Sequence, residues 1–469
     1  MTWRHEVRML WRDRAACVVL LMWCAALLYA LATGWQVAEQ TRVEAANFEK
    51  AALVRTEAQR AKVAQAELSG TVTDRFAGFP STLRAPAVLP VSPLALLTVG
   101  EMDLQPHTAT VSLFTPAGAA AKGQELQSPV SLAIGRFDLG FAVVMLMPLV
   151  LLARGHNQLA EDREQQRLPL LAAQTDVRHL LWRRLAWRGG AVVLPLLIVT
   201  GTAAWVQTGG ASTLSVWSAW LAWTLPVLAW ALFWLALCGA VGGRMAHTGT
   251  AAAVLVSCWL LLVLLLPAAL GALVQTVSPP PSPLLATTAL RTAEVQAERD
   301  RERILGRYIS DNPELKISTV QDDLAWTRNY YAQMQFVEGQ LQPVRAQAAV
   351  AAQAHRTWKS ALVWASPAQV VELALQRAAG TDAARYEAFA AQRAEFKKTW
   401  DVPLVAPLLA GQTVSAADFR TLARFMFREP AAPVGVATAA YLLMLAAALL
   451  LFLRLVELES HAKPRVRVV

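Results

Sequence analysis

Long apolar segments alternate with long polar segments along this chain. Six apolar segments are long enough to cross the hydrocarbon core of a membrane as a helix, which takes about 20 residues. They are residues 15–34, 137–153, 185–207, 213–241, 249–276 and 434–455. Between and beyond them lie residues 1–14, 35–136, 154–184, 277–433 and 456–469. The pattern predicts an all-α polytopic membrane protein with six transmembrane helices.

The two longest polar segments predict a largely helical domain outside the membrane. Residues 36–68 are rich in Ala, Glu, Arg and Gln, contain no Gly or Pro, and precede Gly70, so we expect the first span to continue outward as one helix. The rest of that segment is rich in proline and holds a strand-like run at 108–114. It predicts a small mixed α/β part, with a loosely ordered loop as the alternative.

The second polar segment, residues 277–433, predicts several helices. Ser366-Pro367 supplies a cap with proline at the first helical position, and Gly380 ends that helix. The other predicted helices are residues 287–308, residues 318–364 with a break at Pro343, residues 381–400, and a helix from Ser415 toward Phe427.

Composition and charge agree with a membrane location. Of 469 residues, 55% are hydrophobic and 16% charged, and the mean hydropathy is +0.36. The net charge of +9 gathers mainly in residues 1–14, in 154–184, at Arg244 and in 456–469. The positive-inside rule therefore predicts that both termini are cytoplasmic and both large loops external. This distribution accounts for the positive charge without a nucleic-acid partner.

The N-terminal residues 1–14 predict an amphipathic helix on the membrane surface. Its apolar face carries Trp3 and Trp11, and Arg4, Arg8 and Arg12 lie beside that face, where they would meet lipid headgroups. The lipid bilayer is thus an expected partner. The alternative is a cleaved signal peptide, because Ala30-Leu31-Ala32 resembles a cleavage site.

A charge-dense segment at 154–168 separates the second and third spans. Helix-favouring residues run from 158 to 167, and Pro169 disfavours continuation of the helix. We expect a short helix for docking a soluble partner, with an ordinary polar loop as the alternative. The candidate contact residues are Glu161, Asp162, Arg163, Glu164, Gln165 and Leu168.

This segment resembles a known motif. Asp162-Arg163-Glu164-Gln165 and Leu168 are similar to the Glu-Arg-Glu-x-Gly-Thr-Leu coupling helix of ABC-2 type transporter permeases, with Gln166 and Arg167 at the Gly-Thr positions. The resemblance implies that the helix docks in a cleft of a separate ATPase subunit. ATP and Mg²⁺ would then be bound by that partner.

The second polar segment carries another resemblance. Ser366-Pro367, residues 379–382, Arg385-Tyr386 and Phe389 are similar to the external domain of an uncharacterised ABC-2 permease subfamily with insertions after spans one and five. It implies an ATPase dimer, a second permease copy or a paralogous permease, and the bacterial inner membrane with periplasmic loops. A periplasmic or outer-membrane partner is left open.

The sequence lacks the residue patterns that are typical of ATP binding, metal binding and ion-coupled transport. No Gly-x-x-x-x-Gly-Lys-Ser/Thr loop is present, so we do not expect this chain to bind ATP or to be an enzyme. The histidines are scattered, and the four cysteines all fall within predicted spans, so no metal or cofactor site is expected. No ionisable residue lies deep in a predicted span, which disfavours an ion-coupled carrier. The remaining alternatives are a membrane scaffold or sensor whose external domain binds a partner, and a membrane-embedded enzyme.

Overall fold

The structure is a computed structural model. It describes residues 14–69, 75–115, 136–157, 160–167, 170, 173, 177–208, 214–245, 247–313, 317–318, 324–430, 444 and 447. Trp3, Arg4, Arg8, Trp11 and Arg12 of the predicted surface helix lie outside these residues. So do Leu168, the tail 456–469, and all of the sixth predicted span except Met444 and Ala447.

The described part is mainly helical, and four of its helices are long and apolar enough to cross a membrane. They are Arg14–Ser69, Ala186–Gln207, Leu214–Gly242 and Thr248–Val277. A shorter apolar helix, Leu139–Gly155, coincides with the second predicted span. Almost no sheet is present among the described residues. The prediction of a mainly helical protein with several apolar spans is therefore confirmed at this level.

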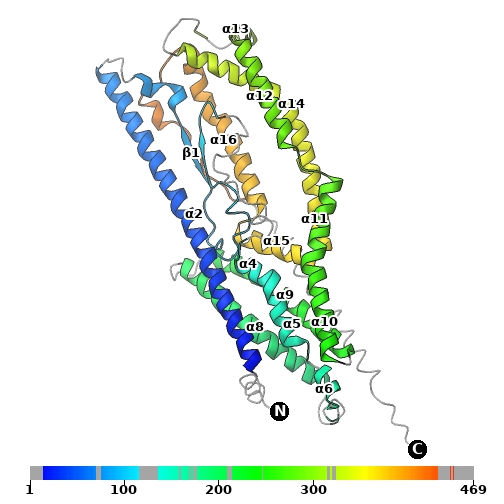
Figure 1. The fold of residues 1–469 in the computed structure, drawn as a ribbon. Helices are drawn as coiled ribbons and strands as arrows, with labels where there is room; N and C mark the ends of the chain where they lie inside the picture. Colours follow the sequence, from blue (N-terminus) through cyan, green and yellow to red (C-terminus); the bar gives the residue numbers. More distant parts are fainter. Residues whose placement is uncertain are drawn as a thin grey trace, which may run out of the picture.

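Helix α2, Arg14–Ser69, extends along one whole side of the molecule (Figure 1). Its 56 residues correspond to about 84 Å at 1.5 Å per residue. The predicted continuation of the first span to residue 68 is confirmed. At Gly34 the helix touches the backbone of Leu96 so closely that a Cβ would lie 2.2 Å from the Leu96 oxygen. Glycine is therefore required where the external segment packs against α2.

The remaining apolar elements follow α2 along the chain. They are α4 Leu139–Phe141, η3 Ala142–Leu146, α5 Met147–Gly155, α8 Val177–Gln207, α9 Leu214–Arg244, α10 Thr248–Trp259, η4 Leu260–Leu265 and α11 Leu266–Val277. Both η3 and η4 are π-helical turns that lead into a proline, Pro148 and Pro267 respectively. Proline lacks the N–H of a regular helix, and wide turns are one way in which a helix adapts to it.

Helix α9 is the most enclosed of these helices. Trp223, Trp230 and Trp234 are completely buried along its length. Helices α5, α8 and α10 all contact it, and so does helix α15, Pro367–Ala379. Helix α9 therefore lies in contact with elements from both ends of the bundle.

The part of the chain that is predicted to lie outside the membrane, called the external part below, combines a long helical hairpin with a small sheet (Figure 1). Its helices are α12 Pro283–Arg299, α13 Arg301–Asp311, α14 Ala325–Leu362, η5 Val363–Ala365, α15, α16 Ala383–Ala410 and η6 Asp418–Arg420. The short elements η1 Arg75–Gly78 and η2 Pro80–Thr82 precede strands β1 Ala85–Val88 and β2 Thr108–Val111. These strands pair antiparallel with Ala85 opposite Val111. The expected strand near 108–114 is thus present.

Several predicted boundaries were wrong. Helix α14 continues through Pro343, and α16 continues past Trp400 through Pro403 and Pro407. Helix α8 begins at Val177, eight residues before the predicted third span, and is continuous to Gln207. The helix expected from Ser415 toward Phe427 is only the single turn η6 followed by extended chain.

The predicted cap of α15 is confirmed at both ends. The Ser366 hydroxyl accepts a hydrogen bond from the Gln369 N–H at 3.4 Å, and Pro367 is the first helical residue. Gly380 ends the helix with φ of +70°, a conformation that favours glycine.

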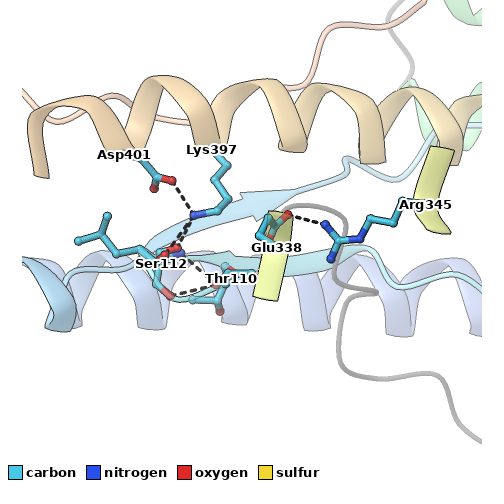
Figure 2. A network of polar contacts seen from close by, with 8 residues as sticks. Thr110, Ser112, Glu338, Arg345, Lys397 and Asp401 are labelled. Carbon is cyan, nitrogen blue, oxygen red and sulfur yellow. Dashed lines mark hydrogen bonds and ion pairs between the residues drawn. The ribbon is translucent and has the colours of Figure 1, made fainter. Parts of the chain in front are cut away.

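A buried lysine joins α16 to the sheet (Figure 2). Lys397 Nζ donates to the main-chain oxygen of Ser112 at 3.1 Å and to Asp401 Oδ2 at 2.7 Å. Glu338 and Arg345 form an ion pair nearby on α14. Burial raises the pKa of Asp401, and the neighbouring Lys397 opposes that rise. These contacts hold α16 against the end of β2, while the second oxygen of Asp401, Oδ1, is buried without a hydrogen-bond partner among the described residues.

The external part and the apolar bundle meet at residues 98 and 99. The Trp223 indole N–H of α9 donates to the Thr98 hydroxyl at 2.9 Å, and the Thr381 hydroxyl donates to the Thr98 main-chain oxygen at 2.9 Å. The N–H of Val99 donates to Asp138, the N-cap of α4, at 2.7 Å. All of these groups are buried, so the two parts share one continuous core.

Candidate coupling site

The predicted docking segment forms helix α6, Ala160–Glu164. It lies at the end of the molecule opposite the external hairpin and the sheet, beyond the ends of α5 and α10 (Figure 1). Leu168 and Pro169 lie outside the described residues, so the chain after α6 can be followed without a gap only as far as Arg167.

An ion pair fixes α6 to α8. Arg184 Nη1 donates to Asp162 Oδ2 at 2.5 Å, and both side chains are largely buried, with 19% and 13% exposed. Removing either partner would leave a charged group without its counter-charge in a partly buried place. Asp162 is therefore a structural contact within the chain and not part of a free docking surface.

Arg163 connects α6 to the end of α9. Its Nη1 donates to the main-chain oxygen of Met245, the residue after α9, at 3.1 Å. The last carbonyls of a helix have no partner within the helix. A guanidinium at this position satisfies one of them and suits the negative end of the helix dipole.

Glu164 connects α6 to α10. Its Oε2 accepts hydrogen bonds from the Thr248 hydroxyl at 2.5 Å and from the Thr248 N–H at 3.3 Å. Thr248 is the first residue of α10, and the N-cap residue His247 makes no side-chain cap of its own. Glu164 therefore caps α10 from another helix. These hydrogen bonds lower the pKa of Glu164, with the Thr248 hydroxyl as the largest cause.

Asn157, two residues after α5, joins α6 to α8. Its amide donates to Glu161 Oε2 at 2.9 Å, and its Oδ1 accepts from Arg188 at 2.7 Å. The same Arg188 nitrogen donates to the main-chain oxygen of Arg154 in α5 at 2.9 Å. Together with the contacts of Asp162, Arg163 and Glu164, these bonds tie α6 to α8, to α10 and to the residues that follow α5 and α9.

The turn after α6 has a defined geometry. Gln166 has φ of +56°, the one positive value among the described residues other than glycine. The Gln166 N–H donates to the Arg163 oxygen at 3.1 Å and the Arg167 N–H to the Asp162 oxygen at 2.8 Å. This is the Schellman pattern, in which the left-handed position is usually glycine. Gln166 occupies the position that is glycine in the similar coupling helices.

The surface left for a partner is at the C-terminal end of α6. Gln165, Gln166 and Arg167 are exposed, and 68% of Leu170 is exposed. Of the predicted contact residues that the structure describes, Gln165 alone is exposed without a contact to another helix; its amide contacts Glu161 at 3.4 Å. A short helix is present where the sequence predicts one, and its residues Asp162, Arg163 and Glu164 contact other parts of this chain.

Four residues of the site were not among those predicted from the sequence: Asn157, Arg184, Met245 and Thr248. Arg184 and Arg188 are four residues apart on a predicted helix, which places them on one face and was the available signal. The sequence could not indicate the Met245 oxygen or the Thr248 N–H, because these are main-chain groups and nearly every residue type supplies them. In the part of the chain that the structure describes, no cluster of His, Cys, Asp and Glu could hold a metal ion.

Comparison with known proteins bears on the external part. A family model for a domain of unknown function (DUF3526) matches residues 284–428, from α12 to the extended chain after η6. The matched range contains α15, α16 and the Ser366-Pro367 cap. No curated protein matches the chain.

Proposed function

We propose that this chain is the membrane-spanning permease subunit of an ABC transporter, driven by a separate ATPase. One observation carries the proposal. Helix α6 is hydrogen-bonded to α8, to α10, to Met245 directly after α9 and to Asn157 two residues after α5, while its C-terminal turn is exposed. A partner that moved this turn would act on the ends of four apolar helices.

The turn geometry supports the resemblance to a coupling helix. The motif has glycine where this chain has Gln166, and Gln166 adopts the left-handed conformation that glycine favours. Asp162, Arg163 and Glu164 occupy the three charged positions of the motif, and each binds a different helix. The motif would thus hold the coupling helix on the bundle, and the exposed residues 165–167 would contact the ATPase.

Helix α9 supplies a route from the coupling site to the external part. At one end, the carbonyl of Met245 accepts from Arg163. Toward the other end, Trp223 donates to Thr98, which also binds Thr381 between α15 and α16. In this proposal a displacement of α6 is passed along α9 to the external helices.

The complete assembly in this proposal has six spans per chain, cytoplasmic termini and periplasmic loops in the bacterial inner membrane. An ATPase dimer holds ATP and Mg²⁺, and a second copy or a paralogue supplies the other permease half. The work done is substrate export or mechanical work on the envelope. The distribution of basic residues supports the orientation, since α6 and Arg184 lie on the predicted cytoplasmic side.

The test is ATP hydrolysis by the complex purified from its native membranes. We expect vanadate-sensitive hydrolysis to copurify with the chain. Making the exposed turn negative with Gln165→Glu plus Arg167→Glu should release the ATPase or uncouple it. Gln296→Glu plus Arg299→Glu on α12 makes the same change of charge on exposed residues; it is the matched control and should change neither property.

An absence of hydrolysis with the native chain would contradict the proposal and favour the membrane scaffold. Glu161 and Glu164 are less suitable targets, because their carboxylates bind Asn157 and Thr248. Changing them would disturb the bundle as well as any docking surface.

A further inference from the structure

A groove of about 640 Å³ lies between the outer half of α2 and the start of the small sheet. Figure 1 shows this half of α2 alongside β1. Gln59 holds the two sides together, donating to the Ala77 oxygen at 2.8 Å and to the Thr82 hydroxyl at 2.7 Å. The volume falls in the range of small-molecule sites, which is about 300–1,000 Å³.

All charged side chains that line the groove are positive. Arg55, Lys62 and Arg84 line it, and no carboxylate is among its lining residues. Within the described residues none of the three cations forms an ion pair, whereas the neighbouring Arg60 pairs with Glu57 at 2.7 Å. Arg55 uses one nitrogen for the Ala51 oxygen and keeps its other donors. Three cations on one groove favour an anionic ligand.

The same groove has an apolar side. Phe48 and Phe76 line it together with Pro86, and 55% of Phe76 is exposed. A large exposed aromatic side chain beside unpaired arginines suits a ligand that combines an apolar ring or chain with an acidic group.

The position of the groove indicates how such a ligand would arrive. Phe48 and Lys62 follow Gly34, the last residue of the first predicted span, by 14 and 28 positions. At 1.5 Å per residue the groove is about 20–40 Å beyond the apolar belt. A lipid that stays in the bilayer would not reach it.

We propose that this groove binds a small amphipathic anion from the aqueous phase. Arg55, Lys62 and Arg84 hold its carboxylate, phosphate or sulfonate group, and Phe48 and Phe76 contact its apolar part. The site requires neither ATP nor an ATPase, so its test is independent of the transport proposal.

The test uses the full chain in nanodiscs of phosphatidylcholine, which carries no net charge. The probe is anilinonaphthalenesulfonate, and its neutral analogue phenylnaphthylamine is the comparison, with empty nanodiscs subtracted. We expect saturable binding of the anion. Arg55→Gln plus Arg84→Gln should raise the Kd of the anion about fivefold or more, because each charge contact, although screened by water, contributes modestly to the binding free energy. Phe76→Ala should weaken binding of the same probe.

The control variant is Arg291→Gln plus Arg299→Gln, which removes the same charge from α12, away from the groove. Its Kd should change less than about twofold, since only the overall charge differs. An equal loss in both double variants would overturn the proposal, as would binding that does not saturate or a neutral analogue that binds as tightly. All four substituted arginines are exposed, so the thermal midpoint should stay unchanged.

Discussion

The carboxylate of Glu164 on α6 accepts hydrogen bonds from both the hydroxyl and the N–H of Thr248, the first residue of α10. One side chain thereby caps a membrane helix that is 84 positions away in the sequence. A cap supplied by another helix links the position of α6 to the start of α10. Several tests of the coupling site follow from such contacts.

The Glu164 contact should depend on pH. Its pKa is lowered in the folded protein from 4.5, so the contact stabilises the fold fully above that value and is lost as pH falls through the lowered pKa. We expect Glu164→Ala to lower the thermal midpoint equally at pH 8 and pH 6. The difference from the native chain should shrink below about pH 4. Gln165→Ala, one residue along, should show no such pH dependence.

The Asp162–Arg184 pair should contribute measurably to stability. Both side chains are mostly buried, and a hydrogen bond between charged groups contributes about 1.5–3 kcal/mol. A double-mutant cycle with Asp162→Asn and Arg184→Gln, followed by unfolding in mixed micelles, measures this coupling. The exposed Arg60–Glu57 pair is the comparison and should give less than about 1 kcal/mol. Equal coupling energies would show that burial of the first pair has no effect.

The turn after α6 should become more stable with glycine. Gln166 has positive φ, so Gln166→Gly relieves an unfavourable backbone conformation by about 0.5–1 kcal/mol. Hydrogen exchange at the Arg167 amide should then slow about two- to fivefold. Gln165→Gly is the control and should speed exchange, because residue 165 has no positive φ to relieve. Faster exchange in Gln166→Gly would contradict the assigned turn.

Gly34 should not tolerate a side chain. A Cβ there would lie 2.2 Å from the Leu96 oxygen, and overpacking typically costs about 1–3 kcal/mol. Gly34→Ala should lower the thermal midpoint, measured by tryptophan fluorescence. Gly190→Ala on α8 meets nothing within 4 Å and should leave the midpoint nearly unchanged. A similar midpoint for both variants would mean that α2 and the external segment are not packed this closely.

The sequence predicted those elements whose signals are local. The uninterrupted helix-forming run after residue 35 predicted the outer half of α2, and Ser366, Pro367 and Gly380 predicted both ends of α15. The charged segment between the second and third spans predicted α6. In each case the backbone conformation follows from residues within a few positions.

Elements decided by distant contacts were predicted less well. The segment after η6 was expected to be helical, but it is extended, because the Gln392 amide bonds both the N–H and the oxygen of Arg428, at 2.9 and 2.7 Å. Phe425 also packs edge to face on Phe389 of α16. Helix α14 continues through Pro343 while it packs along α12. Tertiary contacts therefore outweighed the local preference at both places.

The coupling site shows the same division. The charge-dense segment of the sequence predicted where α6 lies. The direction of its side chains depends instead on their partners, which are Arg184 of α8, the Met245 oxygen and the Thr248 N–H. Main-chain groups of another helix carry no sequence signal. The orientation of Asp162, Arg163 and Glu164 therefore had to come from the structure.

The most direct test of the account is photo-crosslinking from the exposed turn of α6. A benzoylphenylalanine in place of Arg167 should form a crosslink to an ATP-hydrolysing subunit in native membranes, and the crosslink yield should change when vanadate traps the enzyme. The same probe in place of Arg291 on α12 should give no such product. A crosslink to an ATPase from position 167 alone is the predicted result. Its absence, with the chain folded and in the membrane, would contradict the claim that an ATPase drives this protein through α6.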